Sequence, residues 1–189
     1  MTFFGAISGS VKKHECPILE SERLLLRPLR QTDAQAIFSL RSHPDVFKYT
    51  DIQPYQDIER AKKFIQSVKK DIREGEAYFW GITLKDTDYV IGTVCLWNFE
   101  WNKTKVEIGY ELHPSFQHKG IMRETVKTVL NFVAHTLAPL RVDAITHEEN
   151  VPSKRLLDDF EFDLMGRAVE IDPLIEEGPE MLLYQIKIQ

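Results

Sequence analysis

Tyr110-Glu-Leu-His-Pro-Ser-Phe-Gln-His-Lys-Gly-Ile-Met-Arg-Glu124 is the segment from which the architecture of this chain is most readily inferred. An apolar strand ends near Leu112, a loop carries Gln117 and Gly120, and an amphipathic helix follows directly. The first N–H groups of a helix have no partner within the helix, so a helix start of this kind can hold a phosphate. The segment predicts an anion site around Gly120, with a plain strand-to-helix turn as the alternative interpretation.

A second segment, Asn150-Val-Pro-Ser-Lys-Arg-Leu-Leu157, has the pattern of another helix start. Asn150 is a favourable N-cap, and Pro152 suits the first helical turn. A side-chain amide at this place can also form a hydrogen bond with an amide of a ligand. The hydroxyl of Ser153 can donate a proton to a leaving thiolate. Capping and ligand binding are compatible, so both interpretations of this segment stand.

The rest of the chain alternates short strands with amphipathic helices. Thr32 to Gln35 has the form of a capping box that opens an early helix, and apolar residues recur at helical spacing over 57–74. The predicted order β-α-α-β-β-β-α-β-α-β-β indicates one α/β (α+β) domain, with helices flanking a mixed, mainly antiparallel, twisted sheet. The predicted strands are 23–29, 77–84, 89–97, 105–112, 141–146, 163–171 and 181–188, and the predicted helices are 32–41, 57–74, 120–137 and 151–159.

Composition and charge exclude several classes of protein. The chain has 189 residues, 43% of them hydrophobic and 28% charged, which is typical of one globular domain. A net charge of −5 argues against nucleic-acid binding, which depends on cations that neutralise phosphates. No apolar run approaches the roughly 20 residues of a membrane helix. Residues 1–20 lack an export-signal pattern, and we expect them to be an extension before a domain at 21–189.

The two cysteines indicate a reduced protein. Cys16 and Cys95 form no CxxC pattern, and Cys and His residues show no metal-ligand spacing. We therefore expect no metal site and a cytoplasmic location.

Four stretches of the sequence carry a resemblance when they are taken together. They are Glu22-Arg-Leu-Leu-Leu-Arg-Pro-Leu29, Glu107-Ile-Gly-Tyr-Glu-Leu112, Pro114 with Gln117-His-Lys-Gly-Ile-Met-Arg-Glu124, and Asn150, Ser153, Leu156 and Leu157. With these, the chain resembles the GNAT superfamily of N-acetyltransferases over residues 20–188. Within it, the chain is similar to the Rim-type group, which acetylates protein N-termini, small-molecule amines or antibiotics.

Two positions depart from the family pattern. Met122 stands where the family usually has a second small residue of the loop, and backbone contacts to phosphate tolerate this change. Glu161 stands where the family usually has a glycine. If this position requires a positive φ, Glu161 is strained.

The resemblance implies an enzyme that moves an acetyl group directly from acetyl-CoA to a primary amine. A backbone N–H of the strand that ends at Leu112 would bind the carbonyl oxygen, as an oxyanion hole does. Asn150 would contact the pantetheine arm, and Ser153 would protonate the leaving thiolate. Lys119 and Arg123 would add charge to a loop that holds the pyrophosphate. The implied cofactor-binding residues are Leu112, Gln117, His118, Lys119, Gly120, Ile121, Met122, Arg123, Asn150 and Ser153.

The sequence alone does not identify the general base or the acceptor amine. Among the candidate carboxylates we rank Glu170 slightly ahead of Glu111, with Glu107 as a third. The loop 43–56 is expected to form one wall of the acceptor site, and the acid-rich segment 158–180 to attract a cationic amine. The acceptor would be a small-molecule amine or a protein N-terminus, and a homodimer through the sheet edge is compatible with the pattern. The competing hypothesis is a non-catalytic acyl-CoA-binding or interaction module with the same fold, favoured by the two departures.

Overall fold

The computed structural model describes residues 15–49, 53–100, 104–171 and 180–188. Its strands are β1 (Leu19–Glu20), β2 (Leu24–Arg27), β3 (Tyr78–Leu84), β4 (Val90–Trp97), β5 (Lys105–Leu112), β6 (Arg141–His147), β7 (Asp163–Arg167) and β8 (Met181–Lys187). Its α-helices are α1 (Ala34–Ser42), α2 (Ile58–Glu74), α3 (Ile121–Phe132), α4 (Val151–Asp159) and α5 (Ala168–Ile171).

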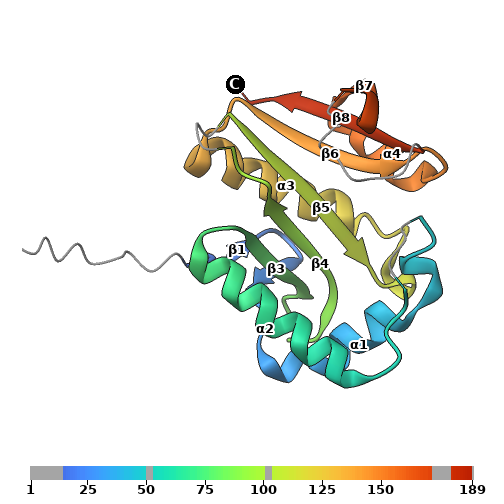
Figure 1. The fold of residues 1–189 in the computed structure, drawn as a ribbon. Helices are drawn as coiled ribbons and strands as arrows, with labels where there is room; N and C mark the ends of the chain where they lie inside the picture. Colours follow the sequence, from blue (N-terminus) through green and yellow to red (C-terminus); the bar gives the residue numbers. More distant parts are fainter. Residues whose placement is uncertain (1–14, 50–52, 101–103, 172–179, 189) are drawn as a thin grey trace, which may run out of the picture.

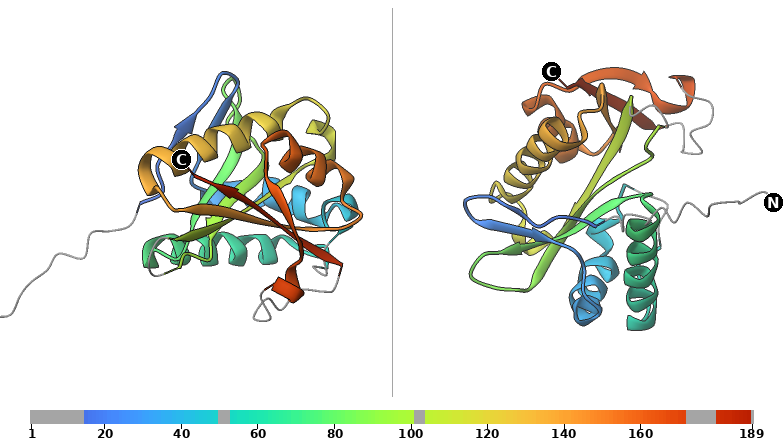
Figure 2. Two further views of the ribbon diagram at one scale, coloured as in Figure 1. Left: turned by 90° about the horizontal axis from the view of Figure 1, so that it is seen from above. Right: turned by 90° about the vertical axis from the view of Figure 1, so that its left-hand side faces the viewer.

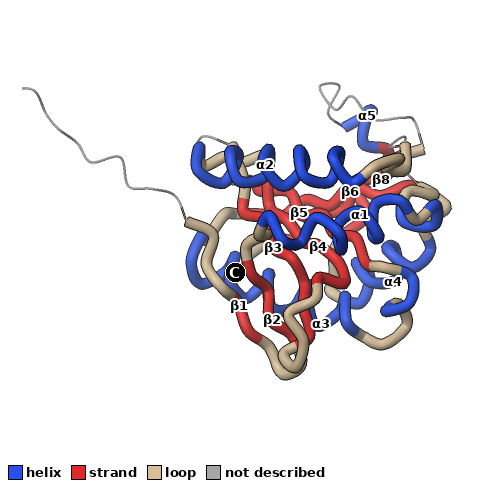
Figure 3. Tube along the Cα trace, turned by 90° about the horizontal axis from the view of Figure 1, so that it is seen from below, coloured by secondary structure: helices blue, strands red, loops and turns tan. Residues whose placement is uncertain are grey.

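The strands form one sheet between two layers of helices. Their order is β1-β2-β3-β4-β5-β6-β8-β7, and neighbours are antiparallel except β5 and β6, which run parallel. Helices α1 and α2 lie across one face of the sheet, while α3 lies on the opposite face with α4 beside it (Figures 1, 2 and 3). The predicted fold class, a mixed and mainly antiparallel sheet flanked by helices, is confirmed. Among the described residues, no helix is long and apolar enough to span a bilayer.

Helix α2 follows directly from its local sequence. The Asp57 side chain at the N-cap accepts a hydrogen bond from the Arg60 N–H at 2.9 Å. Gly75 ends the helix in the left-handed conformation, with φ of 80°. The residues that face the sheet are buried and recur every three or four positions, as predicted: Ala61, Ile65, Val68 and Ile72.

The start of α1 differs from the predicted capping box. Thr32 lies within a short 3-10 turn, and the capping box there is formed by Arg30 and Asp33 instead of Thr32 and Gln35. The Arg30 N–H instead donates to the Asp33 carboxylate at 2.6 Å. The same carboxylate accepts from the buried guanidinium of Arg27 on β2 at 2.8 Å. The Asp33 carboxylate thus bonds the backbone before the 3-10 turn and an arginine of another element, and among the described residues no side chain caps α1 itself.

Two further features lie at the centre of the sheet and along the predicted long helix. A Cβ on Gly109 would lie 2.5 Å from Trp97 Cη2, and the β4–β5 register is continuous, so Gly109 marks a close approach rather than a bulge. The predicted helix 120–137 is present as α3 followed by a wider π-helical turn, Val133–Leu137. Ala138 then ends it in the left-handed region, with φ of 45°.

The predicted strand 163–171 is wrong beyond Arg167. Gly166 has φ of 133°, and the register between β7 and β8 shifts between Leu164 and Gly166. The edge strand bends there, and the chain continues as the short helix α5. Glu170 consequently lies on a helix and not on a strand.

The structure adds a strand at the N-terminal side. Leu19 and Glu20 form β1 and pair with β2, although we expected them to precede the domain. The thiol of Cys16 is buried and donates to the Phe79 carbonyl at 3.5 Å, and burial raises its pKa to about 12. This part of the expected extension packs on the sheet. The remainder, 1–14, lies outside the described residues.

Candidate active site

The predicted phosphate loop forms an open N-terminus on α3. Gly120 is the N-cap with φ of 73°, and among the described residues no side chain caps the helix. The helical hydrogen bonds begin with the Glu124 N–H, which donates to the Gly120 carbonyl at 3.1 Å. The N–H groups of Ile121, Met122 and Arg123 have no carbonyl one turn earlier within the helix. Free amides and the positive end of the helix dipole therefore converge in front of Gly120.

The loop before Gly120 has a backbone suited to anions. His118 has φ of 59°, and Gly120 is also left-handed. Alternation of this kind turns successive N–H groups towards one concave side. The Gln117 amide donates to the Leu112 carbonyl at 3.1 Å, and Lys119 Nζ donates to a loop carbonyl at 2.7 Å. These two side chains brace the loop in this structure.

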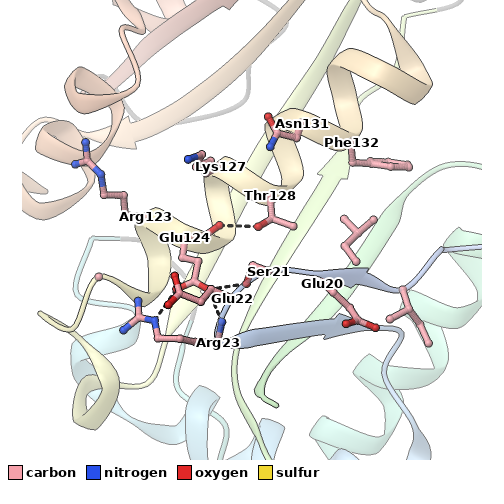
Figure 4. A pocket seen from close by; sticks show the side chains of 13 residues that line it. Glu20, Ser21, Glu22, Arg23, Arg123, Glu124, Lys127, Thr128, Asn131 and Phe132 are labelled. Atoms are coloured by element: carbon pink, nitrogen blue, oxygen red, sulfur yellow. Dashed lines mark hydrogen bonds and ion pairs between the residues drawn. The ribbon is translucent and has the colours of Figure 1, made fainter.

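A clamp from the β1–β2 hairpin supports the same helix end. The Glu124 carboxylate accepts from Ser21 Oγ at 2.7 Å, from the Arg23 N–H at 2.8 Å and from Arg23 Nε at 2.7 Å. Figure 4 shows these contacts of Glu124 with Ser21 and Arg23. Arg23 Nη1 also donates to the Lys119 carbonyl at 3.0 Å. Partial burial opposes ionisation of Glu124, but the bonds from Arg23 and Ser21 outweigh it and lower the carboxyl pKa. No local pattern in the sequence predicts this contact, because it joins residues about a hundred positions apart.

An open groove of about 820 Å³ lies beside the clamp, along α3 (Figure 4). It begins at Gly120 and carries two cations of the helix, Arg123 and Lys127. The Arg123 guanidinium also forms an ion pair with Asp159 at the end of α4. Arg123, which we expected to contact phosphates, is thus bonded to a neighbouring helix in this structure.

The strands β5 and β6 separate beyond their first residues. Within the described residues, their parallel pairing ends at Glu107 and Asp143. On its other edge β5 stays paired with β4, and the His113 N–H donates to a β4 carbonyl at 2.9 Å. Backbone N–H groups alternate between the two edges of a strand, so the Leu112 N–H points into the gap. The gap therefore opens at the end of β5 that adjoins the loop before Gly120, the predicted phosphate loop.

Helix α4 brings a hydroxyl to this gap. The Asn150 Oδ1 caps the helix by accepting from the Ser153 N–H at 3.2 Å, as predicted. Ser153 Oγ lies 2.9 Å from the hydroxyl of Tyr110 on β5. Burial raises the pKa of Tyr110 to about 12, and the bond with Ser153 opposes this shift. The structure thus brings together the two segments that the sequence singled out, and adds Tyr110.

Carboxylates occupy the opposite face of β5. Glu111 Oε1 accepts from Arg41 Nε of α1 at 2.8 Å and from Thr93 Oγ1 at 2.9 Å, with its side chain 13% exposed. Arg41 also donates to the Tyr55 hydroxyl at 3.1 Å, which fixes the end of the loop 43–56. Glu107, on the same face, is buried and accepts from an amide side chain at 3.3 Å. Hydroxyls therefore lie on the α4 side of β5 and carboxylates on the α1 side.

The structure also shows where two further residues named in the sequence predictions lie. Glu170, our first-ranked base, is exposed on α5 and not on the strand from which its role was inferred. Glu161 has φ of 60°, so the strain that was conditional on a positive φ is present. Among the described residues, no group of three or more His, Cys, Asp or Glu side chains could hold a metal ion.

Comparisons with known proteins identify the family. A family model described as an acetyltransferase (GNAT) domain matches residues 23–163. A relative named uncharacterized N-acetyltransferase YoaA, from Bacillus subtilis, is 33% identical over 141 residues, which cover 75% of this chain and 80% of that protein.

Solved structures share the fold. RimL, a ribosomal alpha-N-protein acetyltransferase in complex with coenzyme A, has a TM-score of 0.78 at 21% identity and covers 91% of this chain and 98% of that one. The microcin self-immunity acetyltransferase MccE, in complex with acetyl-CoA and AMP, has a TM-score of 0.76 at 18% identity and covers 89% of this chain and 94% of that one. From the family model and the Bacillus relative, the chain belongs to the GNAT family of N-acetyltransferases, as the resemblance of its sequence segments predicted.

Proposed function

We infer that this N-acetyltransferase takes its acetyl group from acetyl-CoA and transfers it to a primary amine inside the gap between β5 and β6. The observation that carries the proposal is the position of the gap. It opens beside the uncapped N-terminus of α3, with hydroxyls on one side of β5 and a carboxylate on the other. The names of the relatives give no support to the alternative of a non-catalytic module.

The diphosphate of acetyl-CoA would bind in front of Gly120. The amides of the first turn and the left-handed backbone at His118 and Gly120 supply donors for its oxygens. These contacts are made by the backbone, so Met122 does not interfere with them. RimL and MccE were solved with coenzyme A and acetyl-CoA, which supports this donor for the fold.

The thioester would lie in the gap with its carbonyl oxygen at the Leu112 N–H. In the tetrahedral intermediate this oxygen carries the negative charge, and a prearranged donor there stabilises it. Removal of one such donor from other enzymes costs about 3–4 kcal/mol. The Asn150 Oδ1 is used by the helix cap, so its amide N–H₂ would be the part that contacts the pantetheine arm.

Proton transfer would be divided between the two faces of β5. Ser153, on the α4 side, would protonate the sulfur of the leaving coenzyme A. Glu111, on the α1 side, would accept the proton of the attacking amine directly or through a water. We now place Glu111 ahead of Glu170, because Glu111 adjoins the gap whereas Glu170 is exposed on α5.

The acceptor would enter from the α1 side, past the end of the loop 43–56. At that end of the loop, Arg41 of α1 is bonded to the Tyr55 hydroxyl. The acceptor class is a primary amine, of a small molecule or of a protein N-terminus. Asp159, in the acid-rich segment, is already paired with Arg123, so the remaining exposed acids would supply any attraction for a cationic amine.

Two measurements test the proposal. Calorimetric titration with acetyl-CoA should show binding, and a panel of amines and N-terminal peptides should yield at least one product heavier by one acetyl group. Thiol release measured in parallel distinguishes transfer from binding alone. Acetyl-CoA binding without product across the panel would favour the non-catalytic module, and absence of binding would refute the proposal.

The proposal also includes a cytoplasmic location, supported by two free cysteines, and a homodimer. The sheet ends at β7, where Leu164 and Met165 are 54% and 49% exposed. Pairing of two such edges would cover these side chains. Light scattering should then give the mass of a dimer, and a charged substitution at Leu164 should shift it towards the monomer.

A further inference from the structure

Two hydroxyl groups meet across the open gap. Tyr110 Oη and Ser153 Oγ are 2.9 Å apart, and they come from β5 and from the first turn of α4. Ser153 is fixed by the Asn150 cap, and Tyr110 by its place in a strand that is paired on its other edge. The pair is therefore held by backbone elements on both sides, and neither partner relies on a mobile loop.

The two hydroxyls differ in what they can donate. Tyr110 is partly buried, and its raised pKa of about 12 keeps it protonated at neutral pH. When the tyrosine O–H donates to Ser153 Oγ, the serine proton is free to point elsewhere, because a hydroxyl donates one hydrogen bond and accepts others. In the proposed function, the sulfur of coenzyme A lies on this side of β5.

We propose that Tyr110 positions Ser153 and replaces its proton, so that the leaving thiolate is protonated through a relay of two hydroxyls. This rests on the proposed function. The C–S bond breaks with its electron pair on sulfur, and the Ser153 proton forms the S–H bond. The Tyr110 proton passes to Ser153 Oγ. The phenolate then takes a proton from solvent, which balances the proton that the amine releases on the other face.

The relay leaves its transient charge on a phenolate, which is delocalised, instead of on a serine alkoxide. Tyrosine takes part in acid–base catalysis. Although burial raises the pKa of Tyr110 to about 12, its phenol remains a stronger acid than the aliphatic hydroxyl of Ser153. A purely structural role would be different: the same bond would tie α4 to β5 and would matter for stability and binding, but not for proton transfer.

A double-mutant cycle tests the relay in the full-length protein. Tyr110→Phe, Ser153→Ala and the double variant are compared with the wild type in single-turnover acetyl transfer and in acetyl-CoA binding. Tyr184→Phe is the matched control, since Tyr184 is a buried tyrosine on β8, outside the gap. Proton inventories in mixtures of light and heavy water count the protons that move in the rate-limiting step.

The possible results either support the two-hydroxyl relay or exclude it. We expect Tyr110→Phe to lower the transfer rate by about 100-fold with unchanged affinity, and the double variant to be no slower than Ser153→Ala. The inventory should be curved for the wild type and linear for Tyr110→Phe. Independent, multiplying effects, or a rate loss matched by Tyr184→Phe, would overturn the relay alone. Absence of transfer by the wild type would instead overturn the proposed function, and the relay with it.

Discussion

The N-termini of α3 and α4 follow strands of the same sheet, yet they are completed in different ways. Helix α4 is closed by its own sequence, because Asn150 accepts from the Ser153 N–H. Helix α3 begins at a left-handed Gly120, and no side chain in the described part of the chain caps it. Its first turn is instead supported from the side, by the β1–β2 hairpin through Glu124.

The capped start of α4 and the uncapped start of α3 are suited to different roles. A capped terminus holds its residues in place, and α4 thereby fixes Ser153 and its contact with Tyr110. An uncapped terminus keeps amides available, and α3 keeps them beside the gap between β5 and β6. In our proposal, one helix start therefore positions a reacting group, and the other binds the phosphates of acetyl-CoA.

Substitution of the positioned hydroxyl should have the largest effect. Ser153→Ala leaves the backbone N–H that Asn150 caps, so the helix should remain intact. We expect kcat to fall by about 100-fold or more, because the leaving thiolate loses its acid, while acetyl-CoA affinity changes little. Steady-state kinetics and calorimetry give the two values. Equal losses in both would mean that the serine serves only the structure of α4.

Substitution of two left-handed glycines distinguishes a loss of acetyl-CoA binding from a loss of stability caused by backbone strain. Gly120→Ala and Gly75→Ala place a Cβ on backbones with φ of 73° and 80°, so each should destabilise the protein by about 1–2 kcal/mol. Gly75 ends α2, away from the gap. Only Gly120→Ala should also weaken acetyl-CoA binding, by about tenfold, which corresponds to roughly 1.4 kcal/mol.

Chemical denaturation and calorimetry on both glycine variants separate the two effects. A similar loss of affinity in Gly75→Ala would show that strain, and not the open amides, controls binding.

Removal of the two side-chain caps should have a smaller effect. Asn150→Ala and Asp57→Ala each remove one hydrogen bond to a first-turn N–H, at 3.2 Å and 2.9 Å, and should each lower the unfolding free energy by about 1 kcal/mol. Only Asn150→Ala should also slow turnover, because Ser153 depends on that cap. If Asp57→Ala slowed turnover equally, the effect would be one of general stability.

The smallest effect should be a gain in stability. Glu161 follows α4 with φ of 60°, a conformation that glycine adopts without steric cost. Glu161→Gly should therefore stabilise the protein by about 1 kcal/mol and leave acetyl transfer unchanged. Glu161→Ala keeps the strain and is the control. Thermal unfolding of the two variants should separate them, and an equal midpoint would show that the turn is not strained.

Features that depend on a few neighbouring residues were predicted correctly. The caps of α2 and α4 lie within three residues of the amides that they bind, and Gly75 directly follows its helix. The segment 110–124 predicted the strand, loop and helix in that order, because hydrophobic periodicity and glycine position are local signals.

Features that depend on distant partners were missed or misplaced. The Asp33 carboxylate bonds both the Arg30 N–H before α1 and the guanidinium of Arg27 on β2. The predicted strand 163–171 bends at Gly166 because it is an edge strand with one neighbour, and this moved Glu170 onto a helix. A local sequence pattern does not indicate which side chain of a distant element will contact a given residue.

The amino-acid sequence alone determined the family, the two helix starts around which the site is built and the order of elements apart from β1 and α5. Each of these is encoded in contiguous residues. Tertiary structure alone decided that Tyr110 meets Ser153 across 43 positions and that Glu124 meets Ser21 across 103. The tertiary structure also determined that the pairing of β5 with β6 ends at Glu107 and Asp143. Hydrogen bonds act over about 3 Å, so partners far apart in the chain are set by how the sheet folds and not by their neighbours in sequence.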